Sequence, residues 1–349
     1  MRSSDNVSWF ADITLSDRPA VGGKGGSLGE LTRAGIAVPP GFVVRTGAFE
    51  RFLNALEREE SIRPQVEALG SQELDAIAAL SQRLRRRLES APLPADVQSA
   101  ILSAHAELCA DNPILPLAVR SSATTEDSED ASFAGLQDTH LWVMGAQSTL
   151  NNVRSCWASL YSVPSIAYRR KHKLSEEGVA MAVVVQKMVD ARTAGVMFTR
   201  SPLTGDRSVI TIEGTWGLGS AVVSGEVTPD RFVIAKVTGE ITVRDISDKH
   251  IQHVPAAAGG TNEVESGAEL RRAPCLSDEE LLALRDIARK VEDHYGRPQD
   301  IEWAIDRSGM IFLLQSRPET VWSSKEVVPV ARPEQNPLLH VMNLFGGRR

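Results

Sequence analysis

The feature of this sequence that most restricts its fold is a series of short apolar segments, rich in β-branched residues, that begins after Asn112. Glycine, aspartate and proline separate these segments, and such residues commonly bound strands. The segments are ILPLAVR, VAMAVVVQKMV, AGVMFTR, SVITIEG, RFVIAKV, EITVRDI and a final hairpin, DIEWAIDRSGMIFLLQSRP. So many short strands predict β-sheet as the framework of the chain.

Helices are expected in three other places. Residues 46–109 have helical periodicity with breaks near Gly70 and at APLP, and a further helix is expected from Ala146 to Arg170. Ser277 and Glu280 form a capping-box pattern at the start of a third helical region, which Gly296 ends. The apolar face of that helix comprises Leu281, Leu284, Ile287, Ala288 and Val291. Helices and strands together predict an α+β fold with a helical insertion.

Composition excludes several classes of protein. A chain of 349 residues is long enough for two lobes, and a net charge of -7 argues against binding to nucleic acid. The three cysteines are far apart, which favours a reducing, cytoplasmic location over a disulfide framework. No signal peptide is apparent, and the longest apolar segment, near Val179 to Val185, is too short to cross a membrane.

Lys24 lies in the glycine-rich stretch VGGKGGSLGELTRAG. Glycines let backbone amides approach an anion, so a lysine here can neutralise a phosphate. Gly25 stands where a Walker A loop requires serine or threonine, which excludes that loop. Ser27 is expected to cap the following helix and Gly35 to end it; the alternative for Lys24 is a tight turn with a surface lysine.

Arg120 ends the apolar run LAVR and precedes SSATTED. A guanidinium at the end of a buried strand can grip two phosphate oxygens, and the hydroxyl-rich loop can cover them. The alternative is a structural salt bridge to a carboxylate such as Asp127.

The final hairpin predicts a metal and phosphate site. With a two- or four-residue turn, one face carries Asp300, Glu302, Gln315 and Arg317. A three-residue bulged turn would break this alignment. The opposite face is expected to carry Ile301, Trp303, Ile305, Phe312 and Leu314. Carboxylate and amide oxygens suit Mg²⁺; a solvated face of mixed charge is the alternative.

Gln186 and Glu213 are further candidates. Gln186 follows the apolar run AVVV and could form hydrogen bonds with the edge of an adenine base. An ordinary glutamine at the end of a strand is an equally good interpretation. Glu213 precedes GTWGLG and is a candidate metal or ribose contact, while GLGSAV lacks the last glycine of a dinucleotide fingerprint. No histidines show a metal-like spacing, and His250 and His253 are expected at the surface.

Six blocks of the sequence resemble, in order, the nucleotide-binding region of phosphoenolpyruvate synthase (pyruvate, water dikinase). Pyruvate phosphate dikinase and rifampin phosphotransferase share this region. The blocks are VGGKGGSLGEL, AVRSSATTEDSEDASFAGLQDT, VVVQKMV, GVMFTRSPLTG, GTWGLGSAVVSGEVTPD and DIEWAID with LLQSRPET. The resemblance implies a two-lobed ATP-grasp-type fold, with lobes at 1–190 and 191–325. A tail or linker at 326–349 is a candidate partner-docking segment.

The same resemblance implies roles for individual residues. Lys24, Arg120 and Arg317 would bind phosphates, Gly135 and Thr139 would belong to the segment that covers them, and Gln186 would lie beside adenine. Glu302 and Gln315 would bind Mg²⁺, next to an acidic position at Asp300.

Relatives that perform the whole reaction also have a phosphohistidine domain and an acceptor domain, neither of which is recognisable here. The expected function is therefore that of an ATP-binding subunit that passes phosphate to a histidine on a partner protein, with AMP as product. Split enzymes of this kind include phenylphosphate synthase, so phenol and pyruvate are both candidate final acceptors, read by a separate acceptor-binding subunit. An ATP-sensing module and a self-contained ligase that forms an acylphosphate are the alternatives.

Overall fold

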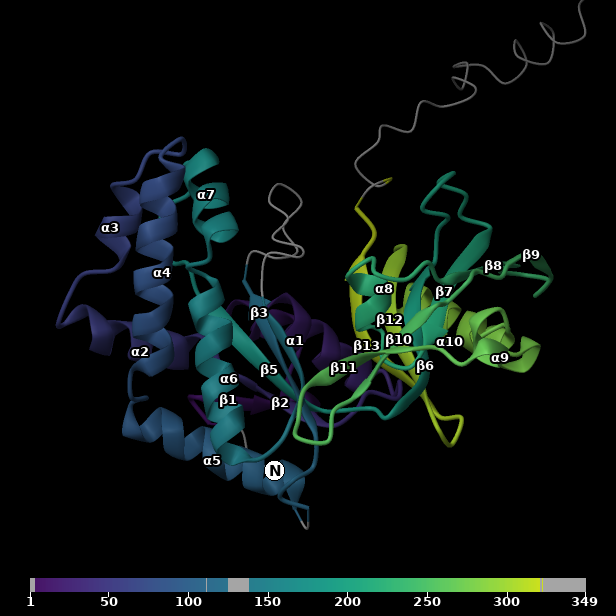
Figure 1. Cartoon of the computed structure of the whole chain (residues 1–349), viewed down its shortest axis with the longest axis horizontal. Helices are drawn as coiled ribbons and strands as arrows, with labels where there is room; N and C mark the ends of the chain where they lie inside the picture. The colour runs from purple at the N-terminus through teal and green to yellow at the C-terminus, as the bar shows by residue number, and fades with distance from the viewer. Residues whose placement is uncertain (1–3, 111, 125–137, 321, 323–349) are drawn as a thin grey trace, which may run out of the picture. The chain divides into compact units, whose positions relative to one another are not determined.

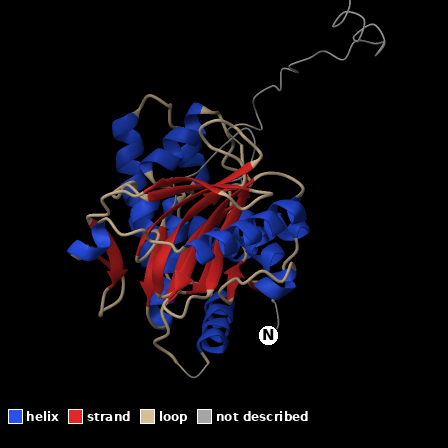
Figure 2. Ribbon diagram, turned by 90° about the vertical axis from the view of Figure 1, so that its right-hand side faces the viewer, coloured by secondary structure: helices blue, strands red, loops and turns tan. Residues whose placement is uncertain are grey.

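The computed structural model describes residues 4–110, 112–124, 138–320 and 322. Met1–Glu319 form one compact unit, and the rest of the chain forms a second. The proposed tail at 326–349 and Gly135 both lie outside the described residues. Within the compact unit, Figure 2 shows the strands gathered at the centre with helices around them.

The first sheet is built from residues up to Lys187, and all its neighbouring strands are antiparallel. In spatial order its strands are β1 (Val7–Trp9), β2 (Gly41–Val44), β5 (Met181–Lys187), β3 (Leu117–Ala123) and β4 (Thr139–Val143). The helices of this part of the chain are α1 (Arg18–Arg33), α2 (Thr46–Glu57), α3 (Arg63–Glu67), α4 (Leu74–Ser90), α5 (Ala95–Cys109), α6 (Ala146–Ser159) and α7 (Val163–Lys171), with two 3₁₀ turns at Phe10–Asp12 and Leu15–Asp17. The breaks predicted near Gly70 and APLP are confirmed.

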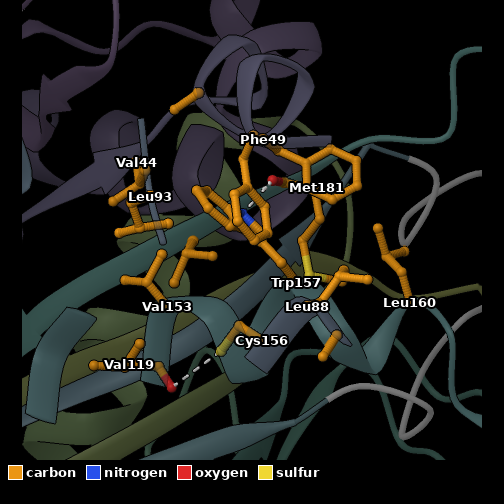
Figure 3. Close-up of a cluster of buried hydrophobic side chains, with 14 of the residues drawn as sticks. Val44, Phe49, Leu88, Leu93, Val119, Val153, Cys156, Trp157, Leu160 and Met181 are labelled. Atoms are coloured by element: carbon orange, nitrogen blue, oxygen red, sulfur yellow. Dashed lines mark hydrogen bonds between the residues drawn. The ribbon is translucent and has the colours of Figure 1, made fainter. Parts of the chain in front are cut away.

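A tryptophan organises the core between this sheet and its helical layer (Figure 3). The ring of Trp157 stacks on Phe52 with 5.2 Å between centroids and packs against Phe49 at 5.8 Å. Its indole nitrogen donates to the carbonyl of Met181 at 3.1 Å, so the polar atom of a fully buried ring is satisfied by the sheet. The helical insertion is thereby joined to β5.

The second sheet begins at Ala191 and has six strands (Figure 1). In spatial order they are β13 (Ile311–Pro318), β12 (Gln299–Asp306), β6 (Ala191–Phe198), β7 (Val209–Trp216), β8 (Asp230–Ala235) and β9 (Ile241–Asp245). The short helices α8 (Ser220–Val223) and α9 (Ala268–Arg271) and the hairpin of β10 (Ile251–Pro255) and β11 (Thr261–Glu265) accompany it. The two sheets give the α+β, two-lobed architecture expected of an ATP-grasp-type fold.

Helix α10 (Asp278–Tyr295) confirms the capping-box prediction. The Ser277 hydroxyl accepts from the Glu280 amide, and Gly296 ends the helix in the left-handed conformation. Its apolar face packs on one side of the second sheet, against Ile301 and Trp303. The other side of β12, β13 and β6 is thus left to face the first sheet.

Three local predictions need correction. The region from Ala146 to Arg170 is two helices, because the Ser162 side chain caps α7 and Pro164 lies in its first turn. Ser27 does not cap a helix: α1 already includes it, and its hydroxyl donates to the Ser316 carbonyl at 2.5 Å. The sequence also gave no sign of β1, β4, β10 or β11.

The final hairpin contains the three-residue bulged turn, yet the alignment of its polar face survives. Gly309 has φ 89° in this turn, and Ile305 pairs with Ile311. Between Glu302 and Trp303 the register shifts by one residue, leaving Leu314 as the extra residue. Beyond that second bulge Glu302 pairs with Gln315 and Asp300 with Arg317, as a two- or four-residue turn would have paired them.

The same bulge makes the prediction for Phe312 and Leu314 wrong. These residues pack with Ala304 and Leu218, whereas Leu313 and Ile311 pack with Trp303. Leu314 therefore lies on the face of the sheet opposite to the one predicted.

No helix among the described residues is both long and apolar enough to cross a membrane. The three cysteines are buried free thiols.

The glycine-rich start of α1 depends on Gly22, which interrupts the helix with φ 71° and ψ 178°. A Cβ at this position would lie 2.1 Å from the carbonyl oxygen of Ser122. Gly35 has a φ of 67°, but a Cβ there would meet nothing within 4 Å. Gly22 therefore combines a backbone conformation that essentially only glycine adopts with a steric overlap that Gly35 lacks.

We expect Gly35→Ala to lower the free energy of unfolding by about 1–2 kcal/mol, the cost of a left-handed alanine. Gly22→Ala should lower it clearly more, because β3 must also move away from α1. Urea unfolding of both variants measures the difference, and equal losses would show that the Ser122 contact is not limiting.

Candidate functional site

A cavity of about 720 Å³ lies between the facing sides of the two sheets. It is bounded by β3, β5, β6, β12, β13 and the segment around α8. The predicted residues that line it are Lys24, Arg120, Thr139, Gln186, Asp300, Glu302, Gln315 and Arg317. Glu213 is not among the lining residues, and Gly135 lies outside the described part of the chain.

Arg120 joins the two sheets across this cavity. It is only 8% exposed and extends from β3 to the second sheet. Its Nη1 donates to the Leu314 carbonyl at 2.7 Å, and its Nη2 donates to Glu302 Oε2 at 2.5 Å and to Gln315 Oε1 at 3.0 Å. The alternative partner Asp127 lies outside the described residues; the carboxylate that Arg120 contacts belongs to the candidate metal pair.

Glu302 and Gln315 are cross-strand neighbours on β12 and β13, and their oxygens converge on one point. In this structure the cationic Arg120 nitrogen lies at that point, within hydrogen-bonding distance of both oxygens. A carboxylate and an amide oxygen directed at one positive group form a donor set that fits Mg²⁺, which prefers hard oxygen ligands. These two side chains would hold the ion, with the remaining positions left to water and ligand oxygens.

Arg317 and Asp300 form a second polar pair beside the first. Arg317 donates to Asp300 Oδ2 through Nε at 2.8 Å, and its Nη2 lies 2.7 Å from the same oxygen. Burial raises the pKa of Asp300, and the neighbouring Arg317 acts in the opposite direction. The Arg317 side chain is 43% exposed, whereas Asp300 is 16% exposed, so the arginine remains accessible from the cavity.

Lys24 owes its position to Gly22 and Ser122. The Ser122 hydroxyl donates to the Val21 carbonyl at 2.8 Å and accepts from the Gly25 amide at 3.1 Å, so β3 supplies the side-chain cap for the helix that follows Gly22. Lys24 lies one residue before that amide and lines the cavity. Lys24 and Arg120 therefore line the same cavity, and the glycines around Lys24 form a kinked helix and not the loop expected from the sequence.

Gln186 and Thr139 also lie where the first sheet meets the cavity. Gln186 is 2% exposed and donates to the Pro39 carbonyl at 3.1 Å, which fixes its amide at the end of β5. Thr139 is exposed and pairs with Arg120 across β3 and β4. Both residues therefore flank Arg120 on the first sheet.

Glu213 belongs to the same face of the second sheet but lies further from the cavity. Across the strands Glu213 pairs with Val196, which in turn pairs with Glu302. Burial raises the pKa of Glu213, Arg231 opposes the increase, and Asp300 adds to it. Glu213 thus influences the charged pairs electrostatically without lining the cavity.

Sequence reasoning missed the apolar wall of the cavity. Val196 and Phe198 line it from β6, while the intervening Met197 is fully buried on the opposite face. Consecutive apolar residues in a strand indicate that both of its faces are covered. The run of Val196, Met197 and Phe198 could therefore have indicated an apolar surface on the cavity side of β6. The wall also includes Leu314, Leu218, Met188 and Val189, and Ser220 and Ser224 add hydroxyls from the α8 segment.

The fold and site together define a two-lobed α+β protein whose sheets enclose a cavity lined by both cationic and acidic side chains. Residues 18–337 match the family model described as "Pyruvate phosphate dikinase, AMP/ATP-binding domain". The match covers most of the chain, and this protein belongs to that family.

Curated relatives carry the same region within longer chains. The chain is 42% identical over 316 residues to a probable phosphoenolpyruvate synthase of Methanothermobacter thermautotrophicus, covering 90% of this chain and 46% of the relative. It is 40% identical over 362 residues to the phosphoenolpyruvate synthase of Aeropyrum pernix, covering 94% of this chain and 44% of the relative. It thus spans less than half the length of these relatives.

Among solved structures, an L-amino acid ligase from Bacillus licheniformis is 11% identical with a TM-score of 0.26, covering 64% of this chain and 42% of the other. A likeness of this size carries no argument about the site.

We expect Glu213→Gln to raise the free energy of unfolding at neutral pH. Because the folded-state pKa of Glu213 is raised, the folded protein binds this proton more tightly than the unfolded chain does, so its contribution to stability is lost as the pH rises through that pKa. Glutamine carries no such proton, and the gain should vanish as the pH falls below the ordinary value of 4.5.

Urea unfolding across this pH range measures the effect, with Glu240→Gln at an exposed position as the matched control. A gain that is equal at acid and neutral pH would contradict the electrostatic explanation.

Proposed function

We propose that this protein binds Mg-ATP in the cavity between its sheets and transfers phosphate to a histidine on a separate protein. The observation that supports this most strongly is the convergence of Lys24, Arg120 and Arg317 with the Glu302–Gln315 pair in one cavity, in a chain of this family. The proposed activity is that of the nucleotide-binding subunit of a phosphotransferase of the phosphoenolpyruvate synthase type.

The three cations suit a triphosphate. Phosphate oxygens accept charge-assisted hydrogen bonds, and arginine can present two parallel donors to them. Arg120 and Arg317 come from different sheets, and Lys24 comes from the helix that β3 caps. A polyphosphate between them would meet positive charge from both lobes, which is the main requirement for phosphoryl transfer.

For a metal ion to bind, Glu302 and Gln315 would have to exchange their contact with Arg120 for contact with the ion. Arg120 contacts both oxygens of the Glu302–Gln315 pair, so Mg²⁺ and the guanidinium cannot hold those oxygens together. With Glu302 and Gln315 holding the ion, the Arg120 guanidinium would be available to phosphate oxygens. A bound Mg²⁺ would supply neutralisation of phosphate charge.

The apolar wall suits the base of the nucleotide. Leu314 and Val196 come from the second sheet, and Ala118 comes from the first. Gln186 lies at the end of β5, immediately before Lys187 and Met188 at the crossing between the sheets. A purine held here would place its polar edge near the Gln186 amide and its phosphates near the cations.

The nucleophile in this proposal comes from outside the described site. Among the residues that line the cavity none is a histidine. We therefore assign the phosphohistidine to a swivelling partner protein and the final acceptor, phenol or pyruvate, to a further acceptor-binding subunit. In this scheme the histidine nitrogen bonds to the β-phosphorus, and the bond from that phosphorus to the oxygen it shares with the α-phosphate breaks. The β and γ phosphates thus pass to the histidine as a pyrophosphoryl group, and AMP leaves.

We expect Arg120→Ala and Arg317→Ala each to weaken binding of Mg-ATP by roughly ten- to a hundredfold, because each removes hydrogen bonds between charged groups. Glu302→Ala should reduce the dependence of ATP binding on Mg²⁺. Calorimetric titration with and without Mg²⁺ measures both effects.

Arg244→Ala is the matched control, since Arg244 also pairs with a carboxylate, Asp278, at 2.7 Å but does not line the cavity. Near-normal affinity for Mg-ATP in the Arg120 and Arg317 variants would show that these residues do not bind the phosphates.

Incubation with β- or γ-labelled ATP and a phosphohistidine-domain protein should give an acid-labile label on that protein. The Arg120→Ala variant should give none. ATP binding without any nucleotide turnover in the presence of the partner would favour the sensing module, and ADP formation that depends on a small carboxylic acid alone would favour the ligase.

A further inference from the structure

The hairpin of β10 and β11 joins the second sheet to the first. At one end, His253 lies beside the segment that leads into α8, where its carbonyl accepts from the Leu218 amide at 2.9 Å. At the other end, the Gly260 amide donates to the Trp142 carbonyl of β4 at 3.0 Å. The hairpin extends from the second sheet toward the first (Figure 1).

Three potential metal ligands meet beside β10. His253 and Glu263 are directly opposite each other in the antiparallel register of β10 and β11, so their side chains share a face. Glu226, which follows α8, brings its Oε2 to 2.9 Å from His253 Nε2. One ligand atom from each of the three residues lies within 4.8 Å of the other two.

The orientation of His253 suits a ligand. Its Nδ1 lies 2.7 Å from the Ser220 hydroxyl, which can accept a hydrogen bond from Nδ1–H. That tautomer leaves the Nε2 lone pair for a cation held between Nε2 and Glu226. A hydrogen bond on the second ring nitrogen is the usual way in which proteins orient a metal-binding histidine. His250 is exposed, as predicted, whereas the side chain of His253 is largely covered, with 14% of it exposed.

Space and charge around the three residues also suit a cation. A cavity of about 620 Å³ adjoins them, lined by Glu226, Glu263 and Glu265 among other residues. Arg271 lines the same cavity, but Asp248 holds its guanidinium with two hydrogen bonds of 2.7 Å. The carboxylates therefore dominate the local charge, and the cavity leaves room for water ligands.

We propose that Glu226, His253 and Glu263 bind a divalent transition-metal ion of the Zn²⁺ or Co²⁺ class. One imidazole nitrogen and two carboxylate oxygens are a donor set that such ions accept, with water in the open positions. Ligand atoms around Zn²⁺ lie about 2.0–2.2 Å from the metal, so small side-chain rotations would bring the three atoms into place. The imidazole favours these ions over Mg²⁺.

The bound ion would attach the hairpin to the wall of the large cavity. Glu226 directly follows the α8 segment, of which Ser220, Val223 and Ser224 line that cavity, while His253 and Glu263 belong to the hairpin. The ion would connect these two segments at a point distinct from the Glu302–Gln315 pair. This inference does not depend on the proposed reaction.

Co²⁺ titration of the untagged, chelator-treated protein in excess Mg²⁺ tests the proposal. We expect one equivalent of Co²⁺ to bind with a visible absorption band, and Zn²⁺ to displace it. His253→Gln and Glu263→Gln should each weaken binding by roughly tenfold or more, and Ser220→Ala should weaken it by about tenfold.

Glu240→Gln is the matched control, because it removes an exposed carboxylate that lines neither cavity. It should leave the Co²⁺ affinity unchanged, as should Glu302→Gln in the nucleotide cavity. Circular dichroism of every variant shows that the fold is retained. Absence of Co²⁺ binding, or binding that survives in His253→Gln and Glu263→Gln, would overturn the proposal.

Amide hydrogen exchange provides a second readout that nucleotide chemistry does not affect. Added Zn²⁺ should slow exchange at Ile251–Pro255 and Thr261–Glu265 in the wild type and not in His253→Gln. Exchange that is unchanged by Zn²⁺ in the wild type would contradict the proposed attachment of the hairpin.

Discussion

The contact on which this structure depends is the one made by Arg120. A permanently charged guanidinium is almost completely removed from water in the middle of β3, and not at the end of that strand as the sequence predicted. The second sheet supplies its carbonyl, carboxylate and amide partners. A buried charge without such partners would be strongly destabilising. The need to satisfy Arg120 therefore helps to hold the two sheets at the distance that creates the cavity.

The polar face of the final hairpin depends on two irregularities that compensate each other. The three-residue turn displaces the pairing by one residue, and the bulge at Leu314 displaces it again. Only after both shifts do Asp300, Glu302, Gln315 and Arg317 share one face. A one-residue change of register would otherwise move half of these side chains into the core beside Trp303.

Much of the fold was accessible from the sequence because its signals are local. The capping box at Ser277, the left-handed stop at Gly296 and the apolar strands each follow from a few adjacent residues. The bulge at Leu314 could not be predicted from the sequence. Phe312, Leu313 and Leu314 are all apolar, so this strand could pair with β12 in either of two registers that differ by one residue. The β10–β11 hairpin was missed because its strands are short and polar, and a single buried apolar residue, Ile251, cannot reveal an alternating pattern.

The candidate site, like the fold, was predictable from the sequence only where its signals are local. The chemistry of Arg120, Glu302 and Gln315 suggested an anion and a cation, but their direct contact depends on how two distant segments pack. Glu213 was selected by its neighbours in the chain, and the sheet places it two strands away from Glu302. The apolar wall carries no polar motif, so only the alternation of Val196, Met197 and Phe198 could have indicated it.

The hydroxyl of Ser122 mechanically links a strand of the first sheet to helix α1. It fastens the strand that carries Arg120 to the helix that carries Lys24 through two short hydrogen bonds, and Gly22 permits the close approach. The same helix is also fastened to the second sheet, because the Ser27 hydroxyl donates to the carbonyl of Ser316, the residue before Arg317, at 2.5 Å. One helix therefore couples the strands that carry the two arginines. Any hinge motion that separates Arg120 from Arg317 must first break this buried hydrogen bond or bend the helix.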